Sequence, residues 1–189
     1  LNKKNVNYTK PANFEKYVAQ KLNEQKIIGW FQGGAEFGPR ALGNRSILTS
    51  PFPKKMKDIL NSRVKFREEF RPFAPAILSE MTNEYFKIKQ SSPHMLIAVE
   101  VKPEKISEIP AVVHIDNSAR VQTVDNSNNP KFRKLLESFY DETGCPVLLN
   151  TSFNVKGQPI VNSPDDAIDC FLSTNIDVLA IGNFIVEKN

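Results

Sequence analysis

Residues 29–48 have the sequence Gly-Trp-Phe-Gln-Gly-Gly-Ala-Glu-Phe-Gly-Pro-Arg-Ala-Leu-Gly-Asn-Arg-Ser-Ile-Leu. The apolar ends of this stretch predict two buried strands, at residues 27–31 and 46–49, and its interior predicts a loop from residue 32 to residue 45. Gly33, Gly34 and Gly38 allow the loop backbone to turn sharply or to approach a ligand closely. The sequence therefore predicts a glycine-rich loop held between two strands of a sheet.

Helices and strands are predicted to alternate irregularly along the rest of the chain. Apolar residues at helical spacing indicate helices at residues 14–22, 56–60 and 132–140, and Ser163-Pro164 followed by two acids indicates the start of another. An apolar run covers residues 73–78, a polar loop is predicted at 150–154, and strands are predicted at 95–101, 112–115, 119–124, 146–149, 177–182 and 184–187. The turn formers Asp116-Asn117-Ser118 separate two of these strands, which could form a hairpin. This irregular order predicts an α+β (mixed α/β) fold with a mixed sheet.

Size and composition indicate one domain. The chain has 189 residues, of which 40% are hydrophobic, enough for a substantial core. Lys plus Arg exceed Asp plus Glu by 25 to 21, a net charge of +4 that suits an anionic ligand without requiring one. Cys145 and Cys170 lie in apolar segments outside any CxxC pair, so we expect neither disulfides nor zinc, and we expect a cytoplasmic location. No apolar run approaches the roughly 20 residues that span a bilayer.

The first residues are polar and rich in Asn and Lys. We expect residues 1–25 to be a linker with a leading helix and residues 26–189 to be the main domain. Because the chain starts inside a segment of linker character, we also expect the upstream part of a longer protein to be missing.

The glycine-rich loop carries two arginines, Arg40 and Arg45, together with Gln32 and Glu36. These side chains can cradle a phosphate. The loop is not a P-loop, because no Gly-Lys-Ser/Thr follows the glycines, and it lacks GxGxxG, so a nucleotide must be bound in another way. A structural turn with both arginines in water explains the same residues equally well.

Further cations lie outside this loop. Lys65, Arg67 and Arg71 stand among phenylalanines within seven positions, an arrangement that can bind phosphoryl oxygens and support a purine face. A loop with its charges in water is the alternative. Arg120 lies in a predicted strand, so its guanidinium must reach a ligand, a sheet edge or a carboxylate, and a structural salt bridge would also satisfy it.

The segment Leu149-Asn150-Thr151-Ser152-Phe153-Asn154 places four hydrogen-bonding side chains after a predicted strand, where α/β proteins commonly bind ligands. Turn formation explains the same residue types. His94 and His114 are the only histidines, and no catalytic triad spacing includes them. No metal site made of protein ligands is predicted.

Three segments taken together closely resemble the C-terminal domain of NodU/CmcH-type carbamoyltransferases: residues 29–48, Lys65-Phe-Arg-Glu-Glu-Phe-Arg-Pro-Phe-Ala-Pro and Leu149-Asn-Thr-Ser-Phe-Asn. The resemblance runs from about Lys26 to Glu187. It implies a YrdC-like fold, a twisted mixed sheet with flanking helices around a cationic cavity. Lys65-x-Arg67 and Ser152-x-Asn154 look like the KxR and SxN signatures of that fold.

The resemblance also implies an activity, that of a carbamoyltransferase. In this family ATP, with Mg²⁺, and carbamoyl phosphate are substrates that form carbamoyladenylate, and the carbamoyl group then passes to an acceptor hydroxyl in a larger N-terminal domain that contains a metal ion. Expected partners are therefore both substrates and the N-terminal transferase domain of the same polypeptide. A membrane or nucleic acid is not expected, and a homodimer stays open.

Site residues follow from the resemblance by position. It implies that Arg40, Lys65, Arg71 and Arg120 surround the phosphates and the carbamoyl group, and that Asn150 and Ser152 orient the adenylate. The further binding candidates are Arg67, Asn154, Gly38 and Arg45. Such a reaction mostly needs alignment and neutralised charge, which fixed Arg and Lys donors supply without a histidine base.

Two other functions stay open. A threonylcarbamoyladenylate-type synthase has the same fold and would use threonine, bicarbonate and ATP, although Gly38-Pro-Arg-Ala-Leu-Gly favours the carbamoyltransferase. A non-catalytic module could bind RNA or a partner through its basic cavity. The role of Glu36, which could orient an arginine or approach Mg²⁺, stays open as well.

Overall fold

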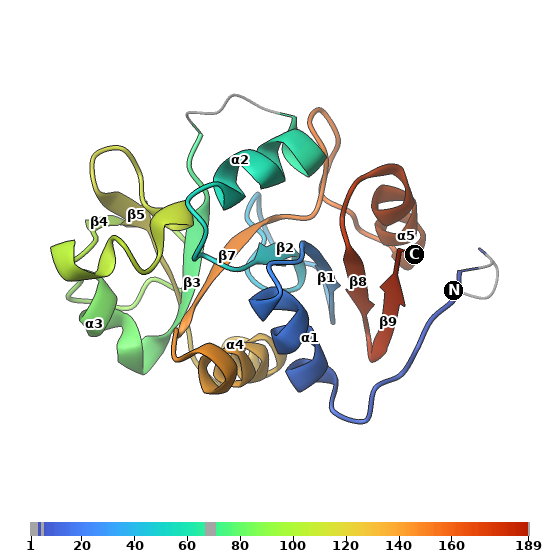
Figure 1. Cartoon of the computed structure of the whole chain (residues 1–189), viewed down its shortest axis with the longest axis horizontal. Helices are drawn as coiled ribbons and strands as arrows, with labels where there is room; N and C mark the ends of the chain where they lie inside the picture. Colours follow the sequence, from blue (N-terminus) through green and yellow to red (C-terminus); the bar gives the residue numbers. More distant parts are fainter. Residues whose placement is uncertain (1–3, 5, 67–70, 189) are drawn as a thin grey trace.

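One mixed sheet organises the molecule. In the computed structural model, which describes residue 4, residues 6–66 and residues 71–188, seven strands are ordered β6-β3-β7-β2-β1-β8-β9 (Figure 1). These strands are β1 (Ile28–Phe31), β2 (Arg45–Thr49), β3 (Ala74–Leu78), β6 (Gln122–Val124), β7 (Val147–Ser152), β8 (Val178–Ile181) and β9 (Phe184–Glu187). Two pairs, β1 with β8 and β3 with β6, are parallel, and the other neighbours are antiparallel. The predicted mixed α/β class is confirmed.

The register of the central strands brings distant segments to one edge of the sheet. Phe31, the last residue of β1, pairs with Arg45, the first residue of β2. Ser46 in turn pairs with Ser152 at the end of β7. The glycine-rich loop between β1 and β2 is therefore placed next to the end of β7, although about 110 residues separate them in the chain.

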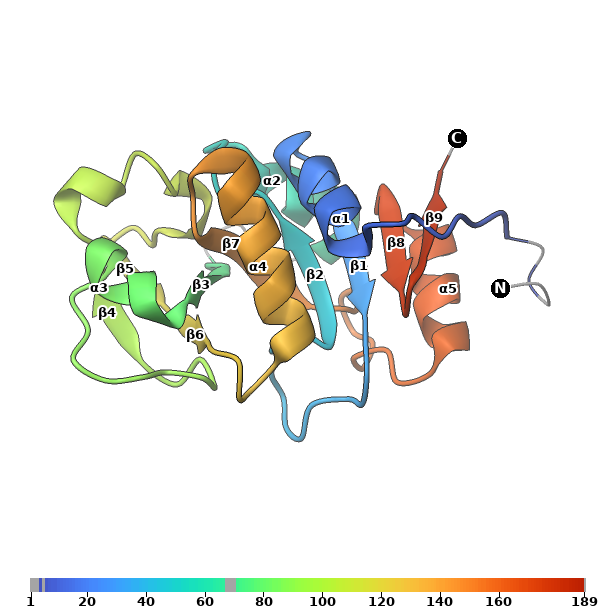
Figure 2. The ribbon, with the colours of Figure 1, turned by 90° about the horizontal axis from the view of Figure 1, so that it is seen from below.

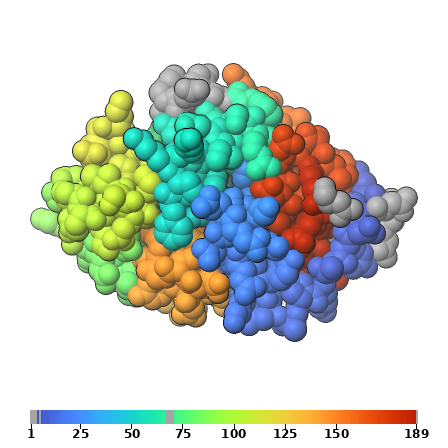
Figure 3. All heavy atoms as spheres, in the orientation of Figure 1, coloured from blue at the N-terminus to red at the C-terminus, as the bar shows by residue number. Residues whose placement is uncertain are grey.

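Helices cover both faces of this sheet. Figure 2 shows α1 (Phe14–Asn23) and α4 (Pro130–Thr143) across one face, with α2 (Met56–Leu60) and α5 (Pro164–Ser173) behind the strands. The space-filling view shows the same neighbours in contact, with α1 in blue between α4 in orange and the C-terminal strands in red (Figure 3). Short helical turns complete the chain: η2, a π-helix (Asn61–Lys65), η3 (Ser79–Met81), α3 (Thr82–Tyr85), η4 (Pro103–Lys105) and η5 (Pro110–Val112).

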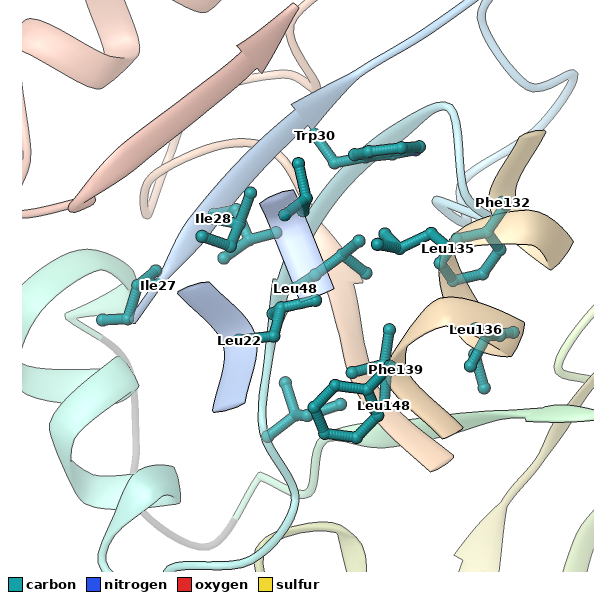
Figure 4. Packing of buried hydrophobic residues seen from close by; sticks show 14 of the residues in the cluster. Leu22, Ile27, Ile28, Trp30, Leu48, Phe132, Leu135, Leu136, Phe139 and Leu148 are labelled. Carbon is teal, nitrogen blue, oxygen red and sulfur yellow. The ribbon is translucent and has the colours of Figure 1, made fainter. Parts of the chain in front are cut away.

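The main core lies between the sheet and the α1–α4 pair. Leu22 of α1, Phe132 and Phe139 of α4, and Leu148 of β7 all have no exposed surface, and Figure 4 shows them converging. Burying each such side chain contributes about 1.5–3 kcal/mol. Trp30 joins the same cluster from β1, so one end of the glycine-rich loop starts from a strand fixed in the core.

The predicted helices are confirmed, and caps define the ends of three of them. Asn13 and Asn129 each accept a hydrogen bond from a backbone N–H in the first turn of α1 and α4. Gly144 ends α4 in the left-handed conformation. Ser163 and Asp166 form a capping box at the start of α5, with Pro164 at its first position.

Several predicted strands are wrong or differ in extent. Residues 112–115 are not a strand, because Pro110 starts a short 3₁₀ turn and the following residues form a turn closed by His114, whose backbone N–H donates to Ser118. The predicted hairpin is therefore wrong as well. Residues 95–101 contribute only β4 (Ala98–Glu100), which pairs with β5 (Ser118–Arg120) in a separate small sheet. Residues 119–124 divide at Val121 between β5 and β6, which belong to different sheets.

The ends of two predicted loops also differ. Asn150, Thr151 and Ser152 belong to β7 rather than to a loop, because β2 and β3 extend the hydrogen-bonded ladder on both sides. Lys65, which the sequence predicts to begin a charged loop at residues 65–71, instead ends the π-helix η2, and residues 67–70 lie outside the described residues. In the leading segment, α1 packs against α4 in the main core. None of the described helices is long and apolar enough to cross a membrane.

Candidate functional site

A cationic pocket opens where the glycine-rich loop meets the end of β7. It holds about 410 Å³ of empty space, part of which is open solvent. Its lining comes from the loop, from β3 and the residues before it, from Met95, from β5 and from β7: Pro39, Arg40, Ala41, Pro72, Phe73, Ala74, Met95, Arg120, Asn150, Thr151 and Ser152. Four predicted site residues from three separate segments thus line one pocket.

Two arginines give this pocket its charge. Arg40 is exposed at the rim, and Arg120 is half-buried with an Nε atom that has no acceptor in the described part of the chain. Burial lowers the pKa of Arg120, and the nearby positive charge of Arg40 lowers it further. Within the described part of the chain, no carboxylate forms an ion pair with either guanidinium. Two neighbouring like charges without a counterion favour the binding of an anion between them.

Lys65 anchors a second, adjoining pocket. Its ammonium group is buried and donates hydrogen bonds to two acceptors of Ser152, the carbonyl O at 2.5 Å and Oγ at 3.2 Å. It also donates hydrogen bonds to two acceptors of Asn154, the carbonyl O at 3.0 Å and Oδ1 at 2.8 Å. Ser152 Oγ donates to the same Asn154 Oδ1 at 2.7 Å. Lysine, serine and asparagine therefore form one rigid polar cluster, which couples η2 to the end of β7.

The second pocket holds about 600 Å³ of empty space, part of it open to solvent. Its lining comes from η2, Arg71 and the loop after β7: Lys65, Arg71, Ser152, Asn154, Val155, Lys156 and Gly157. Ser152 lines both pockets, so the two cationic surfaces are continuous around this residue. An extended, multiply charged anion could contact both at once.

Buried amides connect the cationic pocket to the glycine-rich loop. Asn150, with 1% of its surface exposed, donates from Nδ2 to the carbonyl O of Ala41 at 3.2 Å and to Gln122 Oε1 at 2.8 Å. Gln122 in turn donates to the carbonyl O of Leu42 at 2.8 Å. Asn150 Oδ1 has no hydrogen-bond partner among the residues that the structure describes. Gln122 was not among the residues expected from the sequence, although a polar residue inside an apolar strand was a usable signal.

Three of the predicted binding residues lie elsewhere or outside the structure. Arg45 does not line either pocket: its guanidinium donates to the carbonyl O of Gln32 at 2.7 Å and of Gly33 at 3.1 Å. Gly38, one residue before the pocket-lining Pro39, has φ +120°, a conformation that favours glycine. Arg67 falls outside the described residues. Ligand contacts for all predicted site residues stay predictions.

Neither histidine lies in the cationic pocket. His94 lines a different depression beside Gln122 and Asn129, and His114 is half-buried with Nδ1 3.1 Å from Ser118 Oγ. Burial lowers the pKa of His114. Among the described residues, no three His, Cys, Asp or Glu side chains are grouped so that they could hold a metal ion. The described side chains that line the two pockets supply cations, amides and the hydroxyls of Thr151 and Ser152.

Fold and site together define a class: a mixed α/β domain that gathers cations and buried amides at the edge of its sheet. The chain belongs to the carbamoyltransferase C-terminus family, whose model matches residues 19–188. The resemblance found in the three sequence segments is confirmed.

Curated relatives support the same membership. The chain is 45% identical to nodulation protein NolNO of Sinorhizobium fredii over 90% of its length, which covers 26% of that protein. It is 42% identical to the 3'-hydroxymethylcephem-O-carbamoyltransferase of Streptomyces clavuligerus over 80% of its length, which covers 28% of that enzyme. The chain spans about a quarter to a third of the length of curated relatives such as these.

A solved structure supports the fold. Full-length HypF, in its phosphate- and nucleotide-bound form, matches 95% of this chain with a TM-score of 0.59 and 18% identity, over 22% of its own length. The YrdC-like fold implied by the sequence resemblance, a mixed sheet with flanking helices, is confirmed.

Proposed function

We propose that this chain binds ATP and carbamoyl phosphate in its two joined cationic pockets and forms carbamoyladenylate. One observation carries the proposal: Arg40 and Arg120 converge on one pocket without a counterion, beside Asn150 and Ser152. The relation to an O-carbamoyltransferase supports the choice of the carbamoyl group as cargo. Transfer to an acceptor hydroxyl would belong to the remaining part of a longer polypeptide, since the relatives are three to four times as long.

The proposed chemistry needs no protein nucleophile. Water attack on carbamoyl phosphate releases carbamate and phosphate. A carbamate oxygen then forms a bond to the α-phosphorus of ATP, the bond to the bridging oxygen breaks, and pyrophosphate leaves with the electron pair. Negative charge moves from the attacking oxygen to the leaving pyrophosphate, so fixed guanidinium and ammonium groups stabilise the transition state by electrostatics and alignment.

The residues divide this work by position. Arg40 and Arg120 would bind phosphoryl oxygens in the first pocket, while Arg71 would extend the cationic surface across Ser152 into the second. Lys65 would act mainly by fixing Ser152 and Asn154, because four acceptors already surround its ammonium group. Mg²⁺ would arrive with ATP, held mainly by phosphates and water.

Thermal unfolding with ligands tests the binding step. A ligand at one hundred times its dissociation constant adds about 2.7 kcal/mol to stability, which raises Tm by about 5–10 °C in a chain of this size. We expect such a shift with Mg-ATP and with carbamoyl phosphate. We expect it to be lost in Arg40→Ala and retained in Lys16→Ala, an exposed cation on α1 that serves as the matched control.

Pyrophosphate release, and exchange of labelled pyrophosphate into ATP, test the chemical step. We expect both to require carbamoyl phosphate. Activity with threonine and bicarbonate instead would indicate a threonylcarbamoyladenylate-type synthase. No shift with any small ligand, together with RNA binding that weakens steeply as salt rises, would replace the proposal with a nucleic-acid-binding function.

A further inference from the structure

One oxygen of the Glu36 carboxylate binds the backbone of its own loop and of the first residue of β2. Its Oε1 accepts hydrogen bonds from the backbone N–H of Leu42 at 2.6 Å, Asn44 at 2.8 Å and Arg45 at 3.2 Å. No ion pair joins Glu36 to Arg40 or to any other described cation within 4 Å. A carboxylate so close in sequence to Arg40 could form an ion pair with that arginine. Here Glu36 instead accepts charge-assisted hydrogen bonds from three backbone N–H groups.

The opposite side of the loop is held by Arg45. Its guanidinium donates to the carbonyls of Gln32 and Gly33 and lies 3.7 Å from the centre of the Phe31 ring. Burial lowers the pKa of Arg45, and the nearby charge of Glu36 opposes that effect. Glu36 and Arg45 thus connect the two halves of the loop in both directions. Glu36, in the first half, binds backbone N–H groups of residues 42–45, and Arg45, at the end of the second half, binds the carbonyls of residues 32 and 33.

The segment directly after Arg40 is consequently fixed at every residue. The carbonyls of Ala41 and Leu42 accept from Asn150 and Gln122. The carbonyl of Gly43 accepts from Trp30 Nε1 at 2.7 Å, and its N–H donates to Ser46 Oγ at 3.0 Å. Removing the Glu36 carboxylate would release three of the backbone N–H groups in this segment and leave them without a protein acceptor.

We propose that Glu36 is a positioning residue, which fixes the loop so that Arg40 stands in the cationic pocket beside Arg120, unneutralised and available to an anion. The role of Glu36 in binding rests on the proposed function; its role in fixing the loop does not. This assignment explains why a carboxylate is tolerated in a loop that serves an anion site, since three backbone N–H groups stabilise its charge and no ion pair joins it to either guanidinium group among the described residues.

A double-mutant cycle on the 189-residue chain tests the inference, with inorganic pyrophosphate as the probe and calorimetric titration as the readout. We expect Glu36→Ala to weaken pyrophosphate binding about tenfold, as loss of a charge-assisted arginine contact would. Glu36→Gln, which keeps an oxygen acceptor for the same N–H groups, should stay within about threefold of wild type. In an Arg40→Ala background, Glu36→Ala should cause no further loss.

Three outcomes would overturn the inference. The first is Glu36→Ala binding pyrophosphate as tightly as wild type. The second is an equal fold-loss with and without Arg40, which would mean that Glu36 acts generally on the fold. The third is amide hydrogen exchange at Leu42, Asn44 and Arg45 that does not rise in Glu36→Ala, since the brace would then be absent.

The exchange measurement also separates this inference from the proposed function. If the wild-type chain binds neither pyrophosphate nor Mg-ATP, the proposed function fails. Faster exchange at the three amides in Glu36→Ala, with restoration in Glu36→Gln, would still support the loop brace, and unchanged exchange would refute it. Should Glu36→Ala fail to fold, Glu36→Gln and Arg40→Ala still report on the acceptor and on the arginine.

Discussion

Replacement of Gly43 by alanine tests how closely the glycine-rich loop packs on α4. Gly43 has φ +105°, and a Cβ built there would lie 2.3 Å from Cδ1 and 2.5 Å from Cγ of Phe132. Phe132 cannot move away easily, because it has no exposed surface and belongs to the main core. The new methyl group must therefore displace either the loop or the helix.

The cost follows from two separate effects. A side chain at such a φ costs about 1–3 kcal/mol, and overpacking a filled core costs about 1–3 kcal/mol. We therefore expect Gly43→Ala to lower the free energy of unfolding by at least about 2 kcal/mol, which lowers Tm by about 4–8 °C in a chain of this size. Displacement would also strain the hydrogen bond from Trp30 Nε1 to the Gly43 carbonyl.

Gly34→Ala is the matched control in the same loop. A Cβ there has no atom within 4 Å, and the backbone φ of Gly34 lies outside the left-handed region. Its free energy of unfolding should stay within about 0.5 kcal/mol of wild type in urea titrations. A Gly43→Ala protein that melts within about 1 °C of wild type would refute the reasoning, because the expected decrease in Tm is about 4–8 °C. Equal losses in both variants would assign the effect to glycine flexibility alone.

Three further predictions concern charge and burial. Arg120→Met should leave the unliganded melting temperature unchanged or raise it, since it removes a like-charge neighbour of Arg40, while the Mg-ATP shift should disappear; clear destabilisation without ligand would contradict this. The Arg133 guanidinium lowers the pKa of Glu80 from 4.5 to about 2, so the pair stabilises the fold above pH 4.5 and this is lost as pH falls toward 2. Because Glu80 is mostly exposed, screening limits the contribution of the pair to about 1 kcal/mol or less. In Glu80→Gln, the free energy of unfolding measured in urea should fall less between pH 6 and pH 3 than it does in wild type. An unchanged fall would exclude the pair as its source. Burial raises the pKa of Cys145 to about 11, so this thiol should resist iodoacetamide at pH 8 in the folded chain and react after unfolding; fast labelling of folded protein would show that the site opens.

Elements whose determinants lie close together in the chain could be predicted from the sequence. The helix α4 is an example: Asn129 caps it, Phe132, Leu135, Leu136 and Phe139 form its buried stripe, and Gly144 ends it. The glycine-rich loop and its two flanking strands were equally clear, because apolar runs and glycines define them locally. Motif order was sufficient to indicate the family.

Strand pairing was harder to predict where short segments compete. Residues 112–115 have strand-like composition, yet Pro110 and the His114–Ser118 turn leave them outside both sheets. The partner of β5 is instead β4, with Ala98 opposite Arg120. The turn formers at residues 116–118 do not reveal this pairing. Composition indicates that a segment can pair, but not with which partner.

For the candidate site, the sequence identified most of the residue types and the tertiary structure assigned their contacts. Arg40 and Arg45 looked equivalent in one loop, yet Arg40 lines the cationic pocket while Arg45 braces the backbone. Gln122 and Asn150 reach this loop from 80 and 109 residues away, so their roles depend on how β6 and β7 are placed in the sheet. Helix caps and apolar periodicity act within a few residues, and sequence alone determines them. Hydrogen bonds between distant segments exist only after the sheet has set its register, and for that reason only the tertiary structure decided which arginine lines the cationic pocket and which holds the loop.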